Sequence, residues 1–190
     1  MHPLMRQIAF ERLASRAALL SQTQHDHARY FAGYIQARQK RFAGPEIAQT
    51  LNEIETCFAD IASAWTCLVQ METAGASDSL QLVGEMVDVV YEFCRTRGRL
   101  HTAVDLFGAA LGSLSEGKPN AFADEPIQAR LLGCLGATYA FLGNQEQARK
   151  AVDRAIEIAE ALLAEDALSE QWVYVAETLG FCLWCHLYMV

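Results

Sequence analysis

Cys182, Cys185 and His186 form the pattern C-x-x-C-H near the end of the sequence. This is the spacing of covalent c-type haem attachment, in which two thiols add to the porphyrin and the imidazole binds iron. A zinc site would need a fourth ligand, and the nearest other histidine in sequence is His101. Haem attachment requires an oxidising compartment, and the three residues fall on the apolar side of an expected helix. Buried thiols are therefore our preferred interpretation, and we expect no cofactor and no metal.

A second pattern, residues 112–118, spells the G-x-x-x-x-G-K of a phosphate-binding loop. Pro119 stands where a serine or threonine would hold Mg²⁺, and the segment follows an expected helix rather than a strand. No helix N-terminus is expected there to hold a phosphate. We therefore expect an exposed loop and a chain that is not itself an enzyme; any ATPase activity of a full-length protein would lie outside it.

Charge is unevenly distributed along the 190 residues, of which 52% are hydrophobic and whose net charge is −8. Residues 1–41 carry +5, so residues 42–190 carry −13, and Gly44-Pro45 interrupts the pattern where the sign changes. A predominantly acidic surface argues against a nucleic-acid partner. The composition excludes a disordered chain and predicts a folded one with a substantial core.

The cysteines and the apolar runs indicate in which cellular compartment the protein resides. Most of the six cysteines lie inside apolar helical patterns, and no signal-peptide sequence precedes them. Both observations are typical of buried thiols in a protein of a reducing compartment. The longest apolar run, residues 178–190, is too short to span a bilayer. We expect a cytoplasmic protein with no membrane anchor.

Apolar residues recur three and four positions apart along nearly the whole chain, and strictly alternating β-branched runs are absent. This pattern predicts an all-α fold. Pro45 and Pro126 suit a first helical turn, and Asp78 and Asn144 can cap the helices that follow them. The pattern predicts about eight helices, over residues 3–18, 23–42, 45–73, 79–97, 100–114, 126–142, 145–164 and 167–189.

The chain also contains an internal repeat of 44 to 45 residues. After each of two glycines, a small, a bulky and a second small residue follow at the same spacing. These are Gly98, Ala103, Phe107 and Ala110 in one copy and Gly143, Ala148, Val152 and Ala155 in the next. A Leu-Gly pair with a bulky residue recurs 44 residues apart, as Leu135, Gly136 and Tyr139 and then as Leu179, Gly180 and Leu183. The repeat predicts three copies of a helix pair, the last without its second helix.

Small residues allow antiparallel helices to approach closely, so we expect Ala103, Gly136 and Ala148 where the helices of a pair cross. One pair cannot bury its apolar face alone, and pairs therefore stack into a solenoid with a concave surface lined by their first helices. Helix geometry places seven candidate partner-binding residues on this groove: Glu85, Asp88, Glu92, Arg95, Arg130, Tyr174 and Glu177. A mostly acidic groove would favour basic peptides, and ordinary solvated surface is the alternative.

The repeat resembles a known family, the tetratricopeptide repeat (TPR). Its consensus types are matched within residues 131–161, LLGCLGATYAFLGNQEQARKAVDRAIEIAEA. The N-terminal part resembles bacterial STAND-class regulators of the LuxR or AfsR type, whose ATPase core is NB-ARC-like. Residues 1–14, MHPLMRQIAFERLA, resemble the end of their winged-helix region, and residues 27–39, HARYFAGYIQARQ, resemble the helix after it. Residues 43–65, AGPEIAQTLNEIETCFADIASAW, are similar to the segment that leads into the repeats.

These resemblances imply a right-handed α-solenoid of TPR-like antiparallel helix pairs. Residues 1–44 would be the N-terminal helical segment and residues 45–190 the repeat array, both a fragment of a longer signalling protein. The implied function is a non-catalytic protein interaction or sensor module in signal transduction and transcription regulation. Its implied partners are a protein or peptide ligand and the rest of its own chain. A haem or metal protein and a purely structural scaffold are the alternative functions.

The last expected helix predicts self-association. Its apolar residues lack the second helix that would cover them, so a homodimer through this exposed C-terminal helix is expected. These residues are Phe181, Leu183, Trp184, Leu187 and Tyr188.

Overall fold

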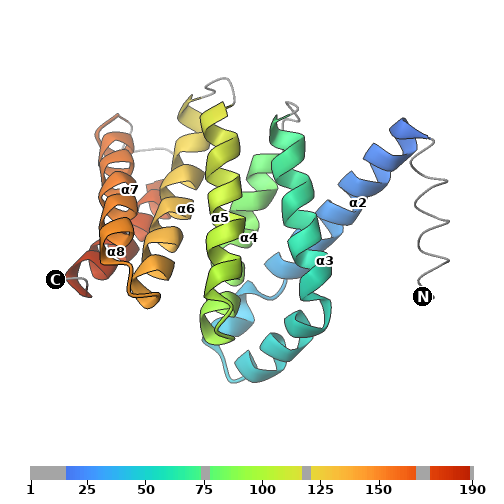
Figure 1. The fold of residues 1–190 in the computed structure, drawn as a ribbon, viewed down its shortest axis with the longest axis horizontal. Coiled ribbons are helices and arrows are strands. Elements are labelled where there is room, and N and C mark those ends of the chain that lie inside the picture. The colour runs from blue at the N-terminus through green and yellow to red at the C-terminus, as the bar shows by residue number, and fades with distance from the viewer. Residues whose placement is uncertain (1–15, 74–77, 117–120, 166–171, 189–190) are drawn as a thin grey trace.

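The computed structural model describes residues 16–73, 78–116, 121–165 and 172–188 (Figure 1). This part of the chain consists of helices and their connections, with no strand, which confirms the all-α class. Seven α-helices and one short 3-10 helix follow in order: α2 (Ala17–Gln36), η1 (Gln39–Ala43), α3 (Ile47–Thr73), α4 (Ser79–Thr96), α5 (Leu100–Glu116), α6 (Ala121–Phe141), α7 (Gln145–Glu165) and α8 (Trp172–Tyr188).

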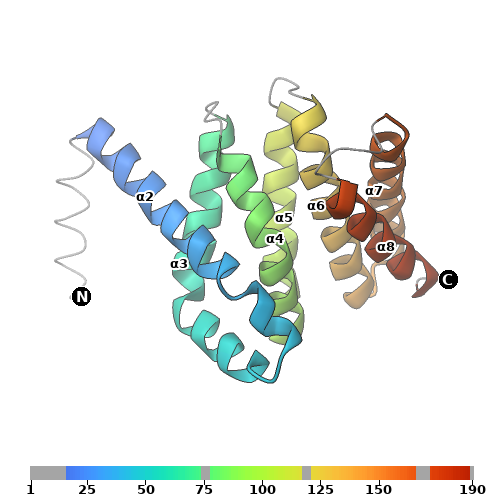
Figure 2. The ribbon, with the colours of Figure 1, turned by 180° about the vertical axis from the view of Figure 1, so that it is seen from behind.

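The helices lie in two layers. From α2 to α8, each α-helix contacts the next along the chain. In addition, α2, α4, α6 and α8 contact one another in that order, and α3 contacts α5. Figures 1 and 2 view the molecule from opposite sides, with α3 and α5 nearest the viewer in the first and α2, α4 and α8 nearest in the second.

Aromatic side chains connect helices within a layer and between the layers, in one continuous core. The buried indole N–H of Trp65 on α3 donates to the carbonyl oxygen of Leu106 on α5 at 2.9 Å, and its ring packs edge-on against Phe107. Phe58 of α3 stacks on Phe93 of α4 with 4.7 Å between ring centroids. Buried residues of α2 belong to the same core. The described part of residues 1–44 therefore packs directly on the segment that follows it.

Gly98 and Gly143 form the turns that connect α4 to α5 and α6 to α7. Their φ angles are +68° and +77°, in the region that favours glycine. Both turns close with the same pair of backbone bonds. Arg99 N–H donates to the Cys94 carbonyl at 2.8 Å, and 45 residues later Asn144 N–H donates to the Tyr139 carbonyl at 2.9 Å. The repeat is thus present in the backbone as well as in the residue types.

Gly136 lies where α6 crosses α7, as the sequence predicts. A Cβ atom at this position would stand 2.6 Å from Val152 Cγ2 and 3.1 Å from the backbone oxygen of Ala148. Ala148 and Val152 are fully buried, and Val152 is β-branched, so neither neighbour can give way easily. Only the absence of a side chain at residue 136 allows the two backbones to approach this closely.

Several helix boundaries differ from the sequence expectation: α2 ends at Gln36 instead of residue 42, and residues 112–116, expected in an exposed loop, belong to α5. Residues 17–36 form one helix, whereas the pattern predicts a break between residues 18 and 23. The polar side chains there are satisfied within the helix: Thr23 Oγ1 donates to the Leu19 carbonyl at 2.8 Å. α6 begins at Ala121, so Pro126 lies inside the helix rather than in its first turn. A proline this close to the N-terminus of a helix interrupts few intrahelical hydrogen bonds, because the first backbone N–H groups of a helix have no intrahelical acceptor.

The two predicted caps behave differently. Asn144 Oδ1 accepts a bond from the backbone N–H of Gln147 at 3.4 Å, which confirms it as a cap of α7. The prediction for Asp78 is wrong, because its side chain makes no capping bond to α4. Its carboxylate faces α2 instead, 3.5 Å from His25 Nε2 and 4.0 Å from Arg29.

A charged network fixes the connection between α2 and α3. Glu53 of α3 accepts bonds from Arg41 at 3.0 Å, from Gln49 at 2.9 Å and from Arg38 at 3.0 Å. Arg38 also lies 3.4 Å above the ring centroid of Tyr34 on α2. These bonds, with that from Arg41 first, lower the pKa of Glu53 to about 2. Part of the basic charge of residues 1–41 is therefore neutralised inside the fold.

We predict that Gly136→Ala destabilises the protein although alanine is the better helix former. Helix propensity favours the change by about 1 kcal/mol, and the clash with α7 opposes it by roughly 1–3 kcal/mol. Urea unfolding followed by circular dichroism measures the difference. The matched control is Gly108→Ala on the exposed face of α5, where a Cβ meets nothing within 4 Å and stability should rise. Equal effects at the two sites would contradict the crossing geometry.

We also predict an acid-dependent contribution from Glu53. Its pKa is lower in the folded chain than its ordinary value of 4.5, so its carboxylate stabilises the fold above that pH. This stabilisation is lost as the pH falls from 4.5 through about 2. The free energy of unfolding of the wild type should therefore fall more steeply over this range than that of Glu53→Gln. Parallel curves for the two proteins would exclude this role.

Candidate interaction surface

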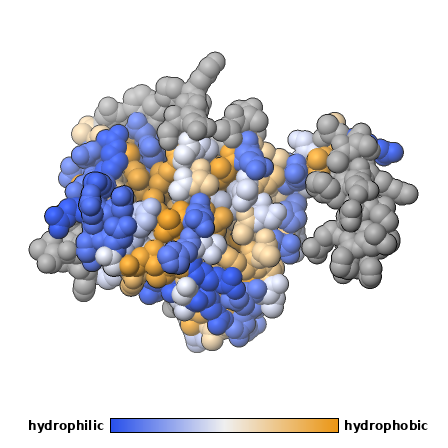
Figure 3. Space-filling model, in the orientation of Figure 1, coloured by the Kyte–Doolittle hydropathy of each residue, from blue (hydrophilic) through white to orange (hydrophobic). Residues whose placement is uncertain are grey.

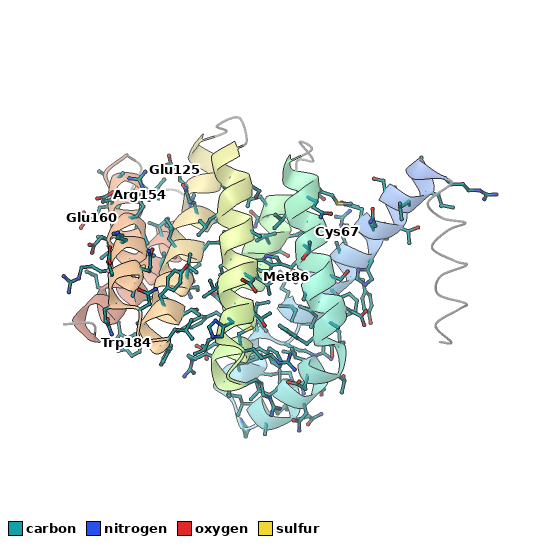
Figure 4. All side chains as sticks on the ribbon, viewed as in Figure 1. Cys67, Met86, Glu125, Arg154, Glu160 and Trp184 are labelled. Atoms are coloured by element: carbon teal, nitrogen blue, oxygen red, sulfur yellow. The ribbon has the colours of Figure 1, made fainter. Side chains whose placement is uncertain are left out.

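Four of the seven candidate residues form a stripe along α4. Glu85, Asp88, Glu92 and Arg95 are spaced three, four and three residues apart, which places them on one side of the helix. The opposite side of α4 is buried, and Met86 lies fully covered at the centre of the bundle (Figure 4). The three carboxylate side chains are half-buried, and Arg95 is exposed. The apolar periodicity of α4 thus leaves these charged residues on its open side.

The structure brings Asp88 together with Arg130 of α6. Arg130 Nε donates to Asp88 Oδ1 at 2.6 Å, and their side chains are only 15% and 29% exposed. The Arg130 guanidinium also lies 4.9 Å from the ring centroid of Phe181 on α8. Tyr91 of α4 meets the same ring edge-on at 5.6 Å. Arg130 therefore joins three helices of one layer, and its guanidinium is engaged within the fold.

Phe181 and Tyr91 were not among the candidates, although they line this junction. Tyr91 lies on the apolar side of α4, and its type alone gives no sign of a neighbour 90 residues away. Phe181 is predicted to be part of an uncovered face, but it is half-buried against Tyr91 and Arg130. The prediction for Phe181 is therefore wrong, because α8 turns this ring toward α4 and α6.

The other candidates remain separate. Glu92 Oε2 and Arg95 Nη2 form an ion pair at 2.7 Å within α4, and this bond raises the pKa of Arg95. Among the described residues, Glu85 makes no ion pair, and Glu177 is exposed on α8. The side chain of Tyr174 lies outside the described residues. Glu85 and Glu92 are thus the carboxylates of this stripe that face outward without an interhelical partner.

The C-x-x-C-H pattern lies on α8. Cys182 is fully buried, and its Sγ would stand 2.8 Å from a Cβ placed on Gly133 of α6. The thiol therefore packs into the α6–α8 contact, as the preferred interpretation expects. The side chains of Cys185 and His186 lie outside the described residues. The other described cysteines are free thiols, half-buried or buried, and burial raises the pKa of Cys94 to about 12.

The face opposite the stripe differs in character. Figure 3 shows hydrophilic residues gathered over α7 and hydrophobic ones across the middle of that face. α7 exposes charges of both signs, among them Arg154 and Glu160, which point outward in Figure 4. Its ion pairs are local: Lys150 Nζ lies 2.7 Å from Glu146 Oε1 one turn away. The stripe on α4 contains an ion pair to another helix, between Asp88 and Arg130.

We predict that the Asp88–Arg130 pair stabilises the protein more than an exposed pair does. A double-mutant cycle with Asp88→Asn and Arg130→Met should give a coupling of about 1 kcal/mol in urea unfolding. The same cycle at Glu146 and Lys150, whose side chains are 76% and 65% exposed, should give about 0.3–0.5 kcal/mol. Equal couplings would show that Arg130 is not a structural clamp.

No helix in the described ranges is long and apolar enough to cross a membrane. Within the same ranges, no three histidine, cysteine, aspartate or glutamate side chains are grouped so that they could hold a metal ion. Comparisons with models of protein families, with curated proteins and with solved structures found no match to the chain.

Proposed function

We propose that the chain is a right-handed α-solenoid of TPR-like helix pairs, α2 with α3, α4 with α5 and α6 with α7, with α8 as the first helix of a further pair. The order of contacts supports this arrangement, since the first helix of each pair touches the first helix of the next. The glycine turns supply a second argument. They carry the same backbone bonds 45 residues apart, as a structural repeat requires.

We further propose that the chain is a non-catalytic protein interaction and sensor module. The observation that carries this proposal is the acidic stripe on α4, which a rigid layer of helices holds in place. The ion pair of Asp88 and Arg130 connects α4 to α6, and the contact of Arg130 with the Phe181 ring connects α6 to α8. Such a surface loses little conformational entropy when a ligand binds. The resemblance to STAND-class regulators suggests a cytoplasmic signalling ATPase or transcription regulator as the longer protein.

The ligand that this surface fits is a basic peptide. Glu85 and Glu92 present carboxylates on either side of Asp88, which is already paired with Arg130. Glu85 and Glu92 lie about two helical turns apart, a span of roughly 10 Å. Glu85 makes no ion pair among the described residues, and Glu92 would exchange its bond to Arg95 of the same helix for one to a lysine or arginine of the peptide. Charges on such a partly exposed surface contribute chiefly to the rate of encounter and to specificity.

The haem alternative receives no support from Cys182. Its sulfur packs against Gly133, and attachment to a porphyrin would require α8 to leave α6. A purely structural scaffold needs no charged stripe for a ligand. Charge reversal on α4 should therefore change ligand binding if the chain is an interaction module and should change no binding if it is a scaffold. The test below separates them.

We predict that Glu85→Lys combined with Glu92→Lys weakens binding of basic peptides. Peptides selected on the wild-type chain from a random library should be rich in lysine or arginine, and the double variant should bind them at least about tenfold more weakly. Fluorescence anisotropy at two salt concentrations measures this. Binding to the wild type should also weaken as salt rises.

The matched control reverses two carboxylates of α7, Glu157→Lys with Glu160→Lys, which are exposed on the other layer. This variant should bind the selected peptides as the wild type does. If the selected peptides bind both double variants as tightly as they bind the wild type, the α4 stripe is excluded as the peptide-binding site. Hydrolysis of ATP by the purified chain at ordinary enzymatic rates would exclude a non-catalytic module.

A further inference from the structure

The charges of α4 and of the turn after it are segregated by sign. All charged residues from 78 to 92 are acidic, and all those from 95 to 99 are basic. The helix dipole explains only part of this order, because it acts over the first and last turns of a helix. Arg95 lies in the last turn of α4, whereas no acidic residue lies in its first turn. A ligand that lies along the stripe therefore meets both signs of charge.

The basic end of α4 holds more arginines than carboxylates. Arg97 and Arg99 share the carboxylate of Glu55 on α3: Arg97 Nε lies 3.8 Å from Glu55 Oε2, and Arg99 Nη2 donates to Glu55 Oε1. Arg95 pairs with Glu92 of its own helix. In these pairs two carboxylates serve three guanidinium groups, so the five side chains together carry an excess of positive charge.

A purely basic ligand that binds Glu92 deprives Arg95 of this acceptor. Glu92 Oε2 accepts bonds from Arg95 Nη2 at 2.7 Å and from Arg95 Nε at 3.2 Å. A lysine or arginine of the ligand that takes over Glu92 makes one ion pair and breaks another. The number of ion pairs then stays the same, while a side chain of the ligand is immobilised. A ligand that also supplies a carboxylate gives Arg95 a new acceptor, and binding then adds an ion pair.

We propose that the α4 stripe binds a peptide segment that carries an acidic residue close to its basic ones, rather than a purely basic segment. This inference rests on the proposed function, because it concerns the ligand of the same surface. Residues three apart on a helix lie about 5–6 Å apart. Side chains on one side of an extended peptide recur at every second residue, about 6.5 Å apart. The carboxylate that meets Arg95 therefore belongs two positions from the basic residue that meets Glu92, and a second basic residue meets Glu85.

Selection from a random peptide library on the wild-type chain tests this proposal. The selected peptides should carry aspartate or glutamate two positions from a lysine or arginine more often than the unselected library does. Selection on Arg95→Gln should keep the preference for lysine and arginine and lose the preference for the acidic residue. In fluorescence anisotropy, replacing the acidic residue of a selected peptide by its amide should weaken binding to the wild type about threefold. The same replacement should leave binding to Arg95→Gln unchanged.

Arg154→Gln is the matched control, because Arg154 pairs with Glu157 on α7 at the same three-residue spacing, 2.9 Å apart. It should leave both preferences unchanged. Circular dichroism should show the wild-type helix content in both variants, since Arg95 and Arg154 are exposed. Selected peptides that are basic but show no acidic preference, or whose acidic preference persists in Arg95→Gln, would overturn this inference and leave the proposed function intact. Absence of any basic preference would overturn both.

Discussion

The close crossing of α6 and α7 at Gly136 is the contact on which the C-terminal half of the molecule depends. An isolated helix of this length gains little stability in water, and most of it comes from packing of an apolar side against a neighbour. At residue 136, backbone and β-branched side chain fill the space that a methyl group would need. This contact fixes α7, and α8 is then placed by α7 and α6 together. The position of the Cys182 and Phe181 side chains follows from that placement.

Charge serves two different purposes in this chain. Where carboxylates and arginines lie between helices, as at Glu53 and at Asp88, they set the position of one helix relative to another. Where they lie on one helix, as along α7, they form local pairs that stabilise little and keep the surface hydrated. The net charge of −8 does not distinguish these uses. Only the tertiary arrangement shows which carboxylates remain available to a partner.

The sequence predicts the helices well where periodicity and turn residues agree. α4, α5 and α7 fall close to their expected ranges because glycine turns and apolar spacing define the same boundaries. The start of α6 is missed, since proline is a strong signal for a first turn and nothing local shows that the helix begins earlier. The stripe on α4 is predictable from helix geometry. The junction of Arg130, Asp88 and Phe181 is not, because it joins residues 42 and 51 positions apart through the rotation of three helices.

The order of contacts from α2 to α8 also has a consequence for folding. Nearly every contact joins helices that are adjacent or next but one along the chain, so the entropic cost of closing loops is small at each step. Folding can begin at any pair that is locally stable and extend in both directions. Among the described helices, α8 packs chiefly on α6 and α7, so its local opening need not disrupt α2 to α5.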